Sequence, residues 1–308
     1  NVAVGMQALT RDTLGSKSTA IGAGALDHQN FTSATDSYNT AVGYGSGSAV
    51  TTGIQNTLIG GLAGDSLDVG SYNIAIGMNA LTTDTKGSKS VAMGYDALGV
   101  QNFTSATDSF NTAIGHGAGR TITTGIQNTL IGSLAGDALQ DADSNVAVGS
   151  NALGVCVLGS RNTAIGIAAL GNTNPSSAAN MINTAMGYAA GYNVTTGTNN
   201  LILGNDSGRS GAPGGAITTG SNIISLGDGN IANAHIQVDW TVASDARDKT
   251  DFTALDLGLD FVKDLQPVTY KWDKRSKYGN KYAEDYDLNA QTPDGTHKED
   301  WLDIGFKA

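Results

Sequence analysis

The sequence contains few of the residues that define several common classes of protein. It has one cysteine, Cys156, in 308 residues, so no disulfide can form within the chain. Four prolines accompany 42 glycines that follow no Gly-X-Y period, which excludes collagen. No apolar run approaches about 18 residues, so we expect no membrane insertion. The first residues, NVAVGMQALT, lack the basic start and apolar core of a signal peptide.

Charge is also scarce, and it is unevenly distributed. Charged residues make up 15% of the chain, the net charge is −11, and no basic stripe occurs, so we expect no nucleic-acid partner. Residues 1–244 hold 7 Lys and Arg and 14 Asp and Glu, whereas residues 245–308 hold 10 and 14. The first part also contains 38 of the 42 glycines. We therefore predict β-solenoid repeats over 1–215, a closing β segment over 216–243 and a different domain over 244–308.

A repeat dominates the first part. The motif Asn-Thr-Ala-Ile-Gly recurs with small variations, and its glycines are spaced by 17, 21, 17 and 17 residues, a pattern that returns every 72 residues. The glycines are Gly5, Gly22, Gly43, Gly60, Gly77, Gly94, Gly115, Gly132, Gly149, Gly166, Gly187 and Gly204. The 21-residue units contain an insert, which reads QNFTSATDSYNT in the first copy and QNFTSATDSFNT in the second.

Each unit alternates with period two, as a strand does. In Asn73–Gly77, Ile74 and Ile76 point one way and Ala75 the other. Units of 17 residues are too short for a helical pair and too rich in Gly and Thr for helix. They suit one coil of a parallel β-solenoid, so the fold class is mainly β. Twelve coils at about 4.8 Å would make a rod of roughly 58 Å.

Two features of the repeat suggest how the rod is held together. The Asn that opens most units is predicted to form a ladder of amide hydrogen bonds up the rod. The small residues Ala75 and Gly77, with their equivalents, leave one face nearly bare, and we expect three copies to meet there as a homotrimer. A monomeric left-handed β-helix of hexapeptides is the alternative, but Ile-Gly does not recur every six residues.

These coils resemble the head repeats of YadA-type trimeric adhesins and similar repeats in bacteriophage tail and head fibres. The adhesin repeats are shorter, so the resemblance lies in the motif rather than in its length.

The charged C-terminal part contains four motifs in succession: Ser244-Asp-x-Arg-x-Lys249, Gly258-Leu259, Pro267-Val-x-Tyr-x-Trp272 and Ile304-Gly305-Phe306. In this order they resemble the start of the peptidase S74 domain, the intramolecular chaperone of phage tail fibres and tailspikes. The resemblance implies a small α+β domain, of which 244–308 would be the N-terminal part.

The resemblance also implies a role for the first of these motifs. Ser244 would attack the backbone at the domain junction and Lys249 would take its proton, with Asp245, Arg247 and Asp248 in support. Such a lysine needs a lowered pKa, and Ser–Lys dyads are a known variant of the catalytic triad. Which bond beside Ser244 breaks is left open. The alternative is that Ser244 caps a turn and Lys249 is solvated.

Four aromatic residues of the inserts are candidates for host contact: Phe31, Tyr38, Phe103 and Phe110. The alternative is that they fold back and fill the rod. The four histidines are scattered and make no ligand set with Cys156, so we expect no metal and no cofactor.

Together these features predict a virion structural protein, a trimeric phage tail fibre or tail-associated fibre made in the host cytoplasm. Its partners would be its own copies, other virion tail proteins and a host surface receptor such as a glycan. At most it would be a single-turnover, self-cleaving serine endopeptidase with no external substrate. A bacterial trimeric surface adhesin is the alternative. A polysaccharide-degrading tailspike ranks last, because no paired carboxylates are evident.

Overall fold

The computed structural model describes residues 1–235, 267–271, 273, 278, 290–298, 300 and 303–306. The chain divides into two compact units, Asn1–His235 and Ile236–Ala308. The described residues contain β-strands and turns and no α-helix, which confirms the mainly β fold class.

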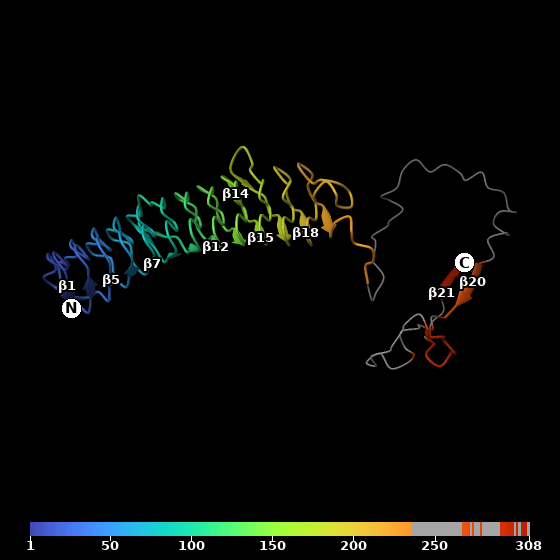
Figure 1. Cartoon of the computed structure of the whole chain (residues 1–308), viewed down its shortest axis with the longest axis horizontal. Helices are drawn as coiled ribbons and strands as arrows, with labels where there is room; N and C mark the ends of the chain where they lie inside the picture. Colours follow the sequence, from blue (N-terminus) through green and yellow to red (C-terminus); the bar gives the residue numbers. More distant parts are fainter. Residues whose placement is uncertain are drawn as a thin grey trace. The chain divides into compact units, whose positions relative to one another are not determined.

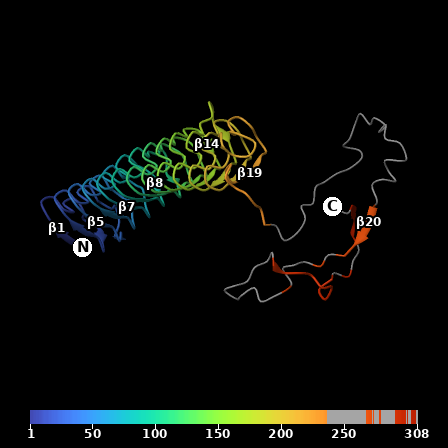
Figure 2. The same cartoon turned by 45° about the vertical axis from the view of Figure 1, so that its right-hand side comes forward.

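The first unit is a parallel β-solenoid of about twelve turns. One strand from each coil joins a single sheet of thirteen strands, and the coils stack from the blue N-terminal end to the orange end in Figures 1 and 2. Neighbouring strands pair in register, so that Ile74, Ala75 and Ile76 lie beside Val91, Ala92 and Met93. The strands of this sheet are β1 (Val2–Val4), β3 (Thr19–Ile21), β5 (Thr40–Val42), β6 (Thr57–Ile59), β7 (Ile74–Ile76), β9 (Val91–Met93), β11 (Thr112–Ile114), β12 (Thr129–Ile131), β13 (Val146–Val148), β15 (Thr163–Ile165), β17 (Thr184–Met186), β18 (Leu201–Leu203) and β19 (Ile224–Leu226). The last strand, β19, lies within the segment expected to close the rod.

Each 21-residue insert adds a short strand that pairs in parallel with the 17-residue coil before it. These two-stranded sheets join β2 (Gly15–Ser16) to β4 (Thr35–Asp36), β8 (Gly87–Ser88) to β10 (Thr107–Asp108), and β14 (Gly159–Ser160) to β16 (Ala179–Asn180). The inserts therefore belong to the stack.

The alternation predicted for the strands is confirmed, but the predicted bare face is wrong. Ala75 and the central residues of the other strands from β3 to β19 are buried inside the coil, whereas Ala3 in the terminal strand β1 is exposed. The glycine that ends each strand is needed for two reasons. Gly77 has φ +134°, and a Cβ there would lie 2.4 Å from the carbonyl oxygen of Gly94 in the next coil. The small residues thus let each coil close on its own interior and approach the next coil.

The interior is filled by leucine and alanine in complementary positions. Most strands have alanine at the centre, whereas every fourth strand has a larger residue, such as Leu58 in β6. Glycines make room for it: a Cβ at Gly47 or Gly64 would lie 2.6 or 2.8 Å from a Leu58 methyl group. The same arrangement recurs 72 residues later, around Leu130.

The asparagine ladder is present. Asn73 is fully buried, and its Nδ2 donates a hydrogen bond of 2.9 Å to the carbonyl oxygen of Gly87 in the next coil. Its Oδ1 accepts one of 2.9 Å from the backbone N–H of Ser90. The Asn73 backbone N–H in turn donates to Asn56 Oδ1, at 2.9 Å. Each amide therefore bonds mainly to the backbone of the neighbouring coil, where it satisfies buried groups that the strands leave unpaired.

The outer face of the thirteen-stranded sheet is largely apolar, and nothing else in the unit Asn1–His235 covers it. The first and third residues of each strand point outward, and they are Thr, Val, Ile, Leu or Met throughout. Ile21, Ile74, Ile131 and Leu226 are among the exposed ones. We call this surface the outer sheet face.

A single methyl group at a strand-ending glycine is expected to disrupt the stack. Gly77→Ala would force alanine to φ near +134° and place its Cβ against the next coil, lowering the free energy of unfolding by about 3 kcal/mol. Gly61→Ala is the matched control, because the nearest atom to a Cβ there is Met78 Cγ at 3.9 Å. Chemical denaturation followed by circular dichroism measures both. Equal stability of the two variants would contradict this account.

Removal of one amide from the ladder is expected to be costly. Asn73→Ala would leave the Gly87 carbonyl and the Ser90 N–H buried without partners, at a cost of about 3 kcal/mol. Asn102→Ala is the control, since Asn102 is exposed and accepts only from Thr85. The same denaturation experiment compares them, and a loss below that of the control would show that the ladder does not stabilise the rod.

Candidate functional site

In the second unit, the structure brings together two of the sequence motifs singled out above. Strands β20 (Pro267–Tyr270) and β21 (Asp303–Phe306) form an antiparallel pair. The register places Val268 beside Gly305 and Thr269 beside Ile304. The Pro-Val-x-Tyr and Ile-Gly-Phe motifs therefore meet although more than thirty residues of chain lie between them.

A small polar cluster lies in the same unit. The hydroxyl of Tyr278 donates to Asp273, at 2.8 Å from Oδ1, and the Gly295 N–H donates to Asp273 Oδ2 at 2.7 Å. The ring of His297 packs edge-on against Tyr278, with 4.9 Å between centroids. Hydrogen bonds from the Thr296 side chain and backbone lower the pKa of Asp294. These contacts fold the 290–298 loop onto Tyr278.

The predicted Ser–Lys site lies outside the described residues. This holds for Ser244 and Lys249 and for the supporting Asp245, Arg247 and Asp248. Their chemistry remains a prediction from the sequence.

Comparison with protein families bears on this part of the chain. Residues 244–306 match the family model Peptidase S74, the chaperone of endosialidase. The second unit therefore carries a Peptidase S74 match that starts at Ser244 and ends at Phe306, the last residue of β21. No curated protein and no solved structure matches the chain.

The structure divides the four aromatic candidates into two pairs. Phe31 and Phe103 are only 6% and 4% exposed, so they fold back into the rod, as the alternative reading expected. Tyr38 and Phe110 are 48% and 51% exposed. Host contact remains a prediction for all four residues, of which only the second pair has an exposed ring. Sequence patterning could not separate the pairs, because both lie in the same insert.

Each exposed ring is covered on one side by a lysine from the coil before it. Lys17 Nζ lies 4.9 Å from the Tyr38 ring centroid and 2.7 Å from Asp36. Lys89 lies 5.1 Å from the Phe110 ring and 2.6 Å from Asp108. The hydrogen bond between Lys17 and Asp36 raises the pKa of Lys17, which stays protonated. The same hydrogen bond lowers the pKa of Asp36. These exposed pairs add little stability, but they orient the rings.

Sequence reasoning missed a buried polar network behind each of the first two inserts. Asp84 Oδ2 accepts a 2.6 Å hydrogen bond from Gln101, and its Oδ1 accepts from the Gly87 and Phe103 N–H groups. Gln101 also donates to Ser90, which pairs with Ser109 at 2.5 Å. Burial raises the pKa of Asp84. The equivalents in the first copy include Asp12 and Gln29.

The third copy replaces this network as a set. Cys156 stands where Asp84 stands in the second copy, and burial raises the pKa of its thiol to about 11. Proline at position 175 replaces Phe103, so the N–H that served the carboxylate is removed together with the carboxylate. The replacements, 72 residues apart, are Asp84 by Cys156, Ser90 by Asn162, Gln101 by Thr173, Phe103 by Pro175 and Ser109 by Met181. Cys156 is thus a buried core residue, as expected from the sequence.

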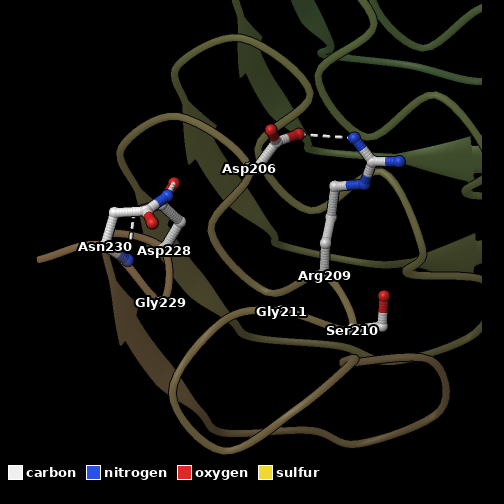
Figure 3. Close-up of a pocket in the computed structure, with 7 residues that line it drawn as sticks. All are labelled: Asp206, Arg209, Ser210, Gly211, Asp228, Gly229 and Asn230. Carbon is white, nitrogen blue, oxygen red and sulfur yellow. Dashed lines mark hydrogen bonds and ion pairs between the residues drawn. The ribbon is translucent and has the colours of Figure 1, made fainter.

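An open pocket of about 410 Å³ lies at the C-terminal end of the rod (Figure 3). Asp206 points at the guanidinium of Arg209 and forms an ion pair with it, and Asp228 accepts two hydrogen bonds from Asn230. The Asn230 side chain lowers the pKa of Asp228. Because Arg209 is paired with Asp206 and Asp228 is hydrogen-bonded by Asn230, the pocket offers a ligand few unsatisfied polar groups.

Two further findings concern only the described residues. Among them, no group of three or more His, Cys, Asp or Glu residues is placed to hold a metal ion. Within the same residues, no helix is long and apolar enough to cross a membrane.

The buried network around Asp84 is expected to make the folding stability depend on pH. Because burial raises the pKa of Asp84, the folded state binds the carboxyl proton of Asp84 more tightly than the unfolded state does. The contribution of this proton to folding stability is therefore greatest below pH 3.8, and it is lost as pH rises through the folded-state pKa. Transplanting the third copy's set (Asp84→Cys, Ser90→Asn, Gln101→Thr, Phe103→Pro, Ser109→Met) should remove this loss. Urea unfolding at pH 4 and pH 7 measures the difference.

The matched control is Asp84→Ala alone. It would leave the Gln101 amide and two backbone N–H groups without an acceptor, at a cost of about 3 kcal/mol. A transplant as unstable as this control, or one with the pH dependence of the wild type, would contradict the account.

Proposed function

We propose that this chain is a virion structural protein, a trimeric phage tail fibre or tail-associated fibre whose C-terminal domain acts as an intramolecular chaperone. The observation that carries the proposal is a Peptidase S74 match at 244–306 directly after a parallel β-solenoid. A long rod of stacked coils suits a shaft or contact surface, and the matched family is described as a chaperone.

The repeat itself gives a reason for a chaperone. Successive coils bury the same pattern, so three chains shifted by one coil against each other would still bury apolar residues. Long-range parallel pairing is also slow to form. A C-terminal domain that assembles first would align the chains before the coils associate. Its removal afterwards would leave the trimer kinetically trapped.

The outer sheet face supports association with further copies of the chain. It runs the length of the rod, about 58 Å, and three strand residues span about 10 Å. A largely apolar strip of roughly 600 Å², threonines included, is at the upper end of what monomers expose. Three such faces meeting around an axis parallel to the rod would bury all of them. The threefold interface is therefore proposed for this face in place of the small-residue face.

Self-cleavage is proposed for the matched domain. The Ser244 hydroxyl would attack a neighbouring backbone carbonyl carbon while the neutral amine of Lys249 accepts the hydroxyl proton. The C–N bond would then break, with Lys249 returning the proton to the leaving amine, and water would hydrolyse the ester. The mature fibre would associate with other tail proteins and contact a host surface receptor such as a glycan, after synthesis in the host cytoplasm.

The test follows the chain from cell to particle. The protein expressed from its complete gene should appear in purified particles as a chain cut beside Ser244, running as a trimer on an unboiled gel. Intact mass spectrometry locates the cut. Ser244→Ala and Lys249→Ala should each abolish it, because one lacks the nucleophile and the other the base. Lys263→Ala is the control and should be cut normally.

The outcomes separate the parts of the proposal. An uncut trimer in particles would remove the protease and leave the fibre. A chain found on the surface of bacterial cells and absent from particles would favour a trimeric adhesin. A monomer would overturn the trimeric fibre.

A further inference from the structure

Two rows of residues flank the outer sheet face. One row lies five residues before each strand-ending glycine, and we call it the leading row. The other lies one residue after that glycine, and we call it the trailing row. In the coil that ends at Gly43 the two members are Tyr38 and Tyr44, which are 48% and 70% exposed. Residues of the leading row have left-handed backbone, with φ of 51° at Tyr38 and 63° at Tyr72, so the chain turns sharply just before each strand.

The two rows vary together in most coils. The four coils of a 72-residue copy are counted from the one whose strand ends at Gly5, Gly77 or Gly149. In the third coil of each copy, both members are large and aromatic or aliphatic. These pairs are Tyr38 with Tyr44, Phe110 with His116, and Ile182 with Tyr188.

In the fourth coil of each copy, the leading member is an amide and the trailing member is small or polar. These pairs are Gln55 with Gly61, Gln127 with Ser133, and Asn199 with Asn205.

In the first coil of a copy, the two members change together between copies. In the second copy it has Tyr72 with Met78, which are 48% and 53% exposed. In the third copy both members have become serine, Ser144 and Ser150. A large pair has thus been replaced by a small pair at both ends of one strand.

The second coil has a cation in the leading row in every copy. These pairs are Lys17 with Ala23, Lys89 with Tyr95, and Arg161 with Ile167. A long cationic side chain can lie along an apolar neighbour or over a ring and keep its charge in water.

The members of a pair do not meet within one chain. They are six positions apart in the sequence, which is up to about 20 Å of extended chain, and the outward side chains of the strand lie between them. The side-chain contacts seen in the rows run up the rod. Tyr95 stacks on His116 in the trailing row with centroids 5.3 Å apart, and Lys17 lies over Tyr38 in the leading row. Matched variation across the strand therefore points to contact between chains.

We infer that the leading row of one chain packs against the trailing row of a second copy at the same coil level, around a threefold axis parallel to the rod. This inference rests on the proposed trimer. When three outer sheet faces enclose an axis, the end of each strand comes beside the start of the strand in the next copy. Parallel symmetry places equivalent coils at equal height. Large pairs then fill the three corners, and Tyr38 and Phe110 serve the interface between copies in place of host contact.

Cysteine cross-linking tests the level of contact. In a Cys156→Ala background, the matched variants Tyr38→Cys/Tyr44→Cys and Tyr72→Cys/Met78→Cys are treated with a short bis-maleimide and run on a boiled gel. Each should give a covalent trimer. The mismatched variants Tyr38→Cys/Met78→Cys and Tyr72→Cys/Tyr44→Cys use the same four positions two coils apart, about 10 Å along the rod, and should lose the trimer band.

Native mass measurement of each variant keeps the two proposals separate. A native trimer without cross-linking in either matched variant would overturn the pairing and leave the fibre proposal standing. Cross-linking of the mismatched variants would show a staggered register and also overturn the pairing. A covalent dimer as the largest product would indicate a twofold assembly. A native monomer would overturn both the trimer and the pairing that rests on it.

Discussion

The distance between successive coils constrains the rest of this solenoid. Parallel strands are held about 4.8 Å apart by backbone hydrogen bonds, and every residue must fit that spacing. At Gly77 the fit excludes even a methyl group, because the Gly94 carbonyl lies where a Cβ would be. The buried Asn73 amide bridges the same step where the strand cannot, through Gly87 and Ser90. Glycine and asparagine thus recur in the motif because each solves a problem that every coil poses again.

The interior changes only in coordinated ways. Leu58 is accommodated by Gly47 before its strand and Gly64 after it, and the set returns every 72 residues. The network around Asp84 is exchanged as a unit in the third copy, where Cys156, Pro175 and Met181 lie together beside Gly159. A half-exchanged set would leave buried donors without acceptors, which costs more than either complete set. The coil interior therefore tolerates replacement by sets.

The period, the parallel solenoid and the asparagine ladder were predictable because each follows from spacing that recurs along the chain. The direction of the strand faces was not. Alternation shows that Ala75 and Ile76 point opposite ways, but it does not say which side is inside. A coil of 17 residues is too narrow to hold branched side chains from every strand, so alanine is buried and isoleucine faces outward. Phe31 and Tyr38 differ for a similar reason: one lies where the insert folds onto the rod and the other at the corner before a strand. The match at 244–306 was predictable from the order of its motifs.

The residues that distinguish one coil from another are mostly exposed on the coil surface. The buried positions repeat so closely that they cannot distinguish a correctly aligned chain from one displaced by one coil. Under the proposed pairing, such a shift would put Tyr38 opposite Gly61, where a large side chain meets no partner. A shift of four coils preserves the spacing of the 72-residue copies, yet it would put Tyr72 opposite Ser150. Register would then be encoded in the two rows beside the strands. A C-terminal chaperone would be needed to start assembly in that register, and the rows would hold it once the chaperone domain has left.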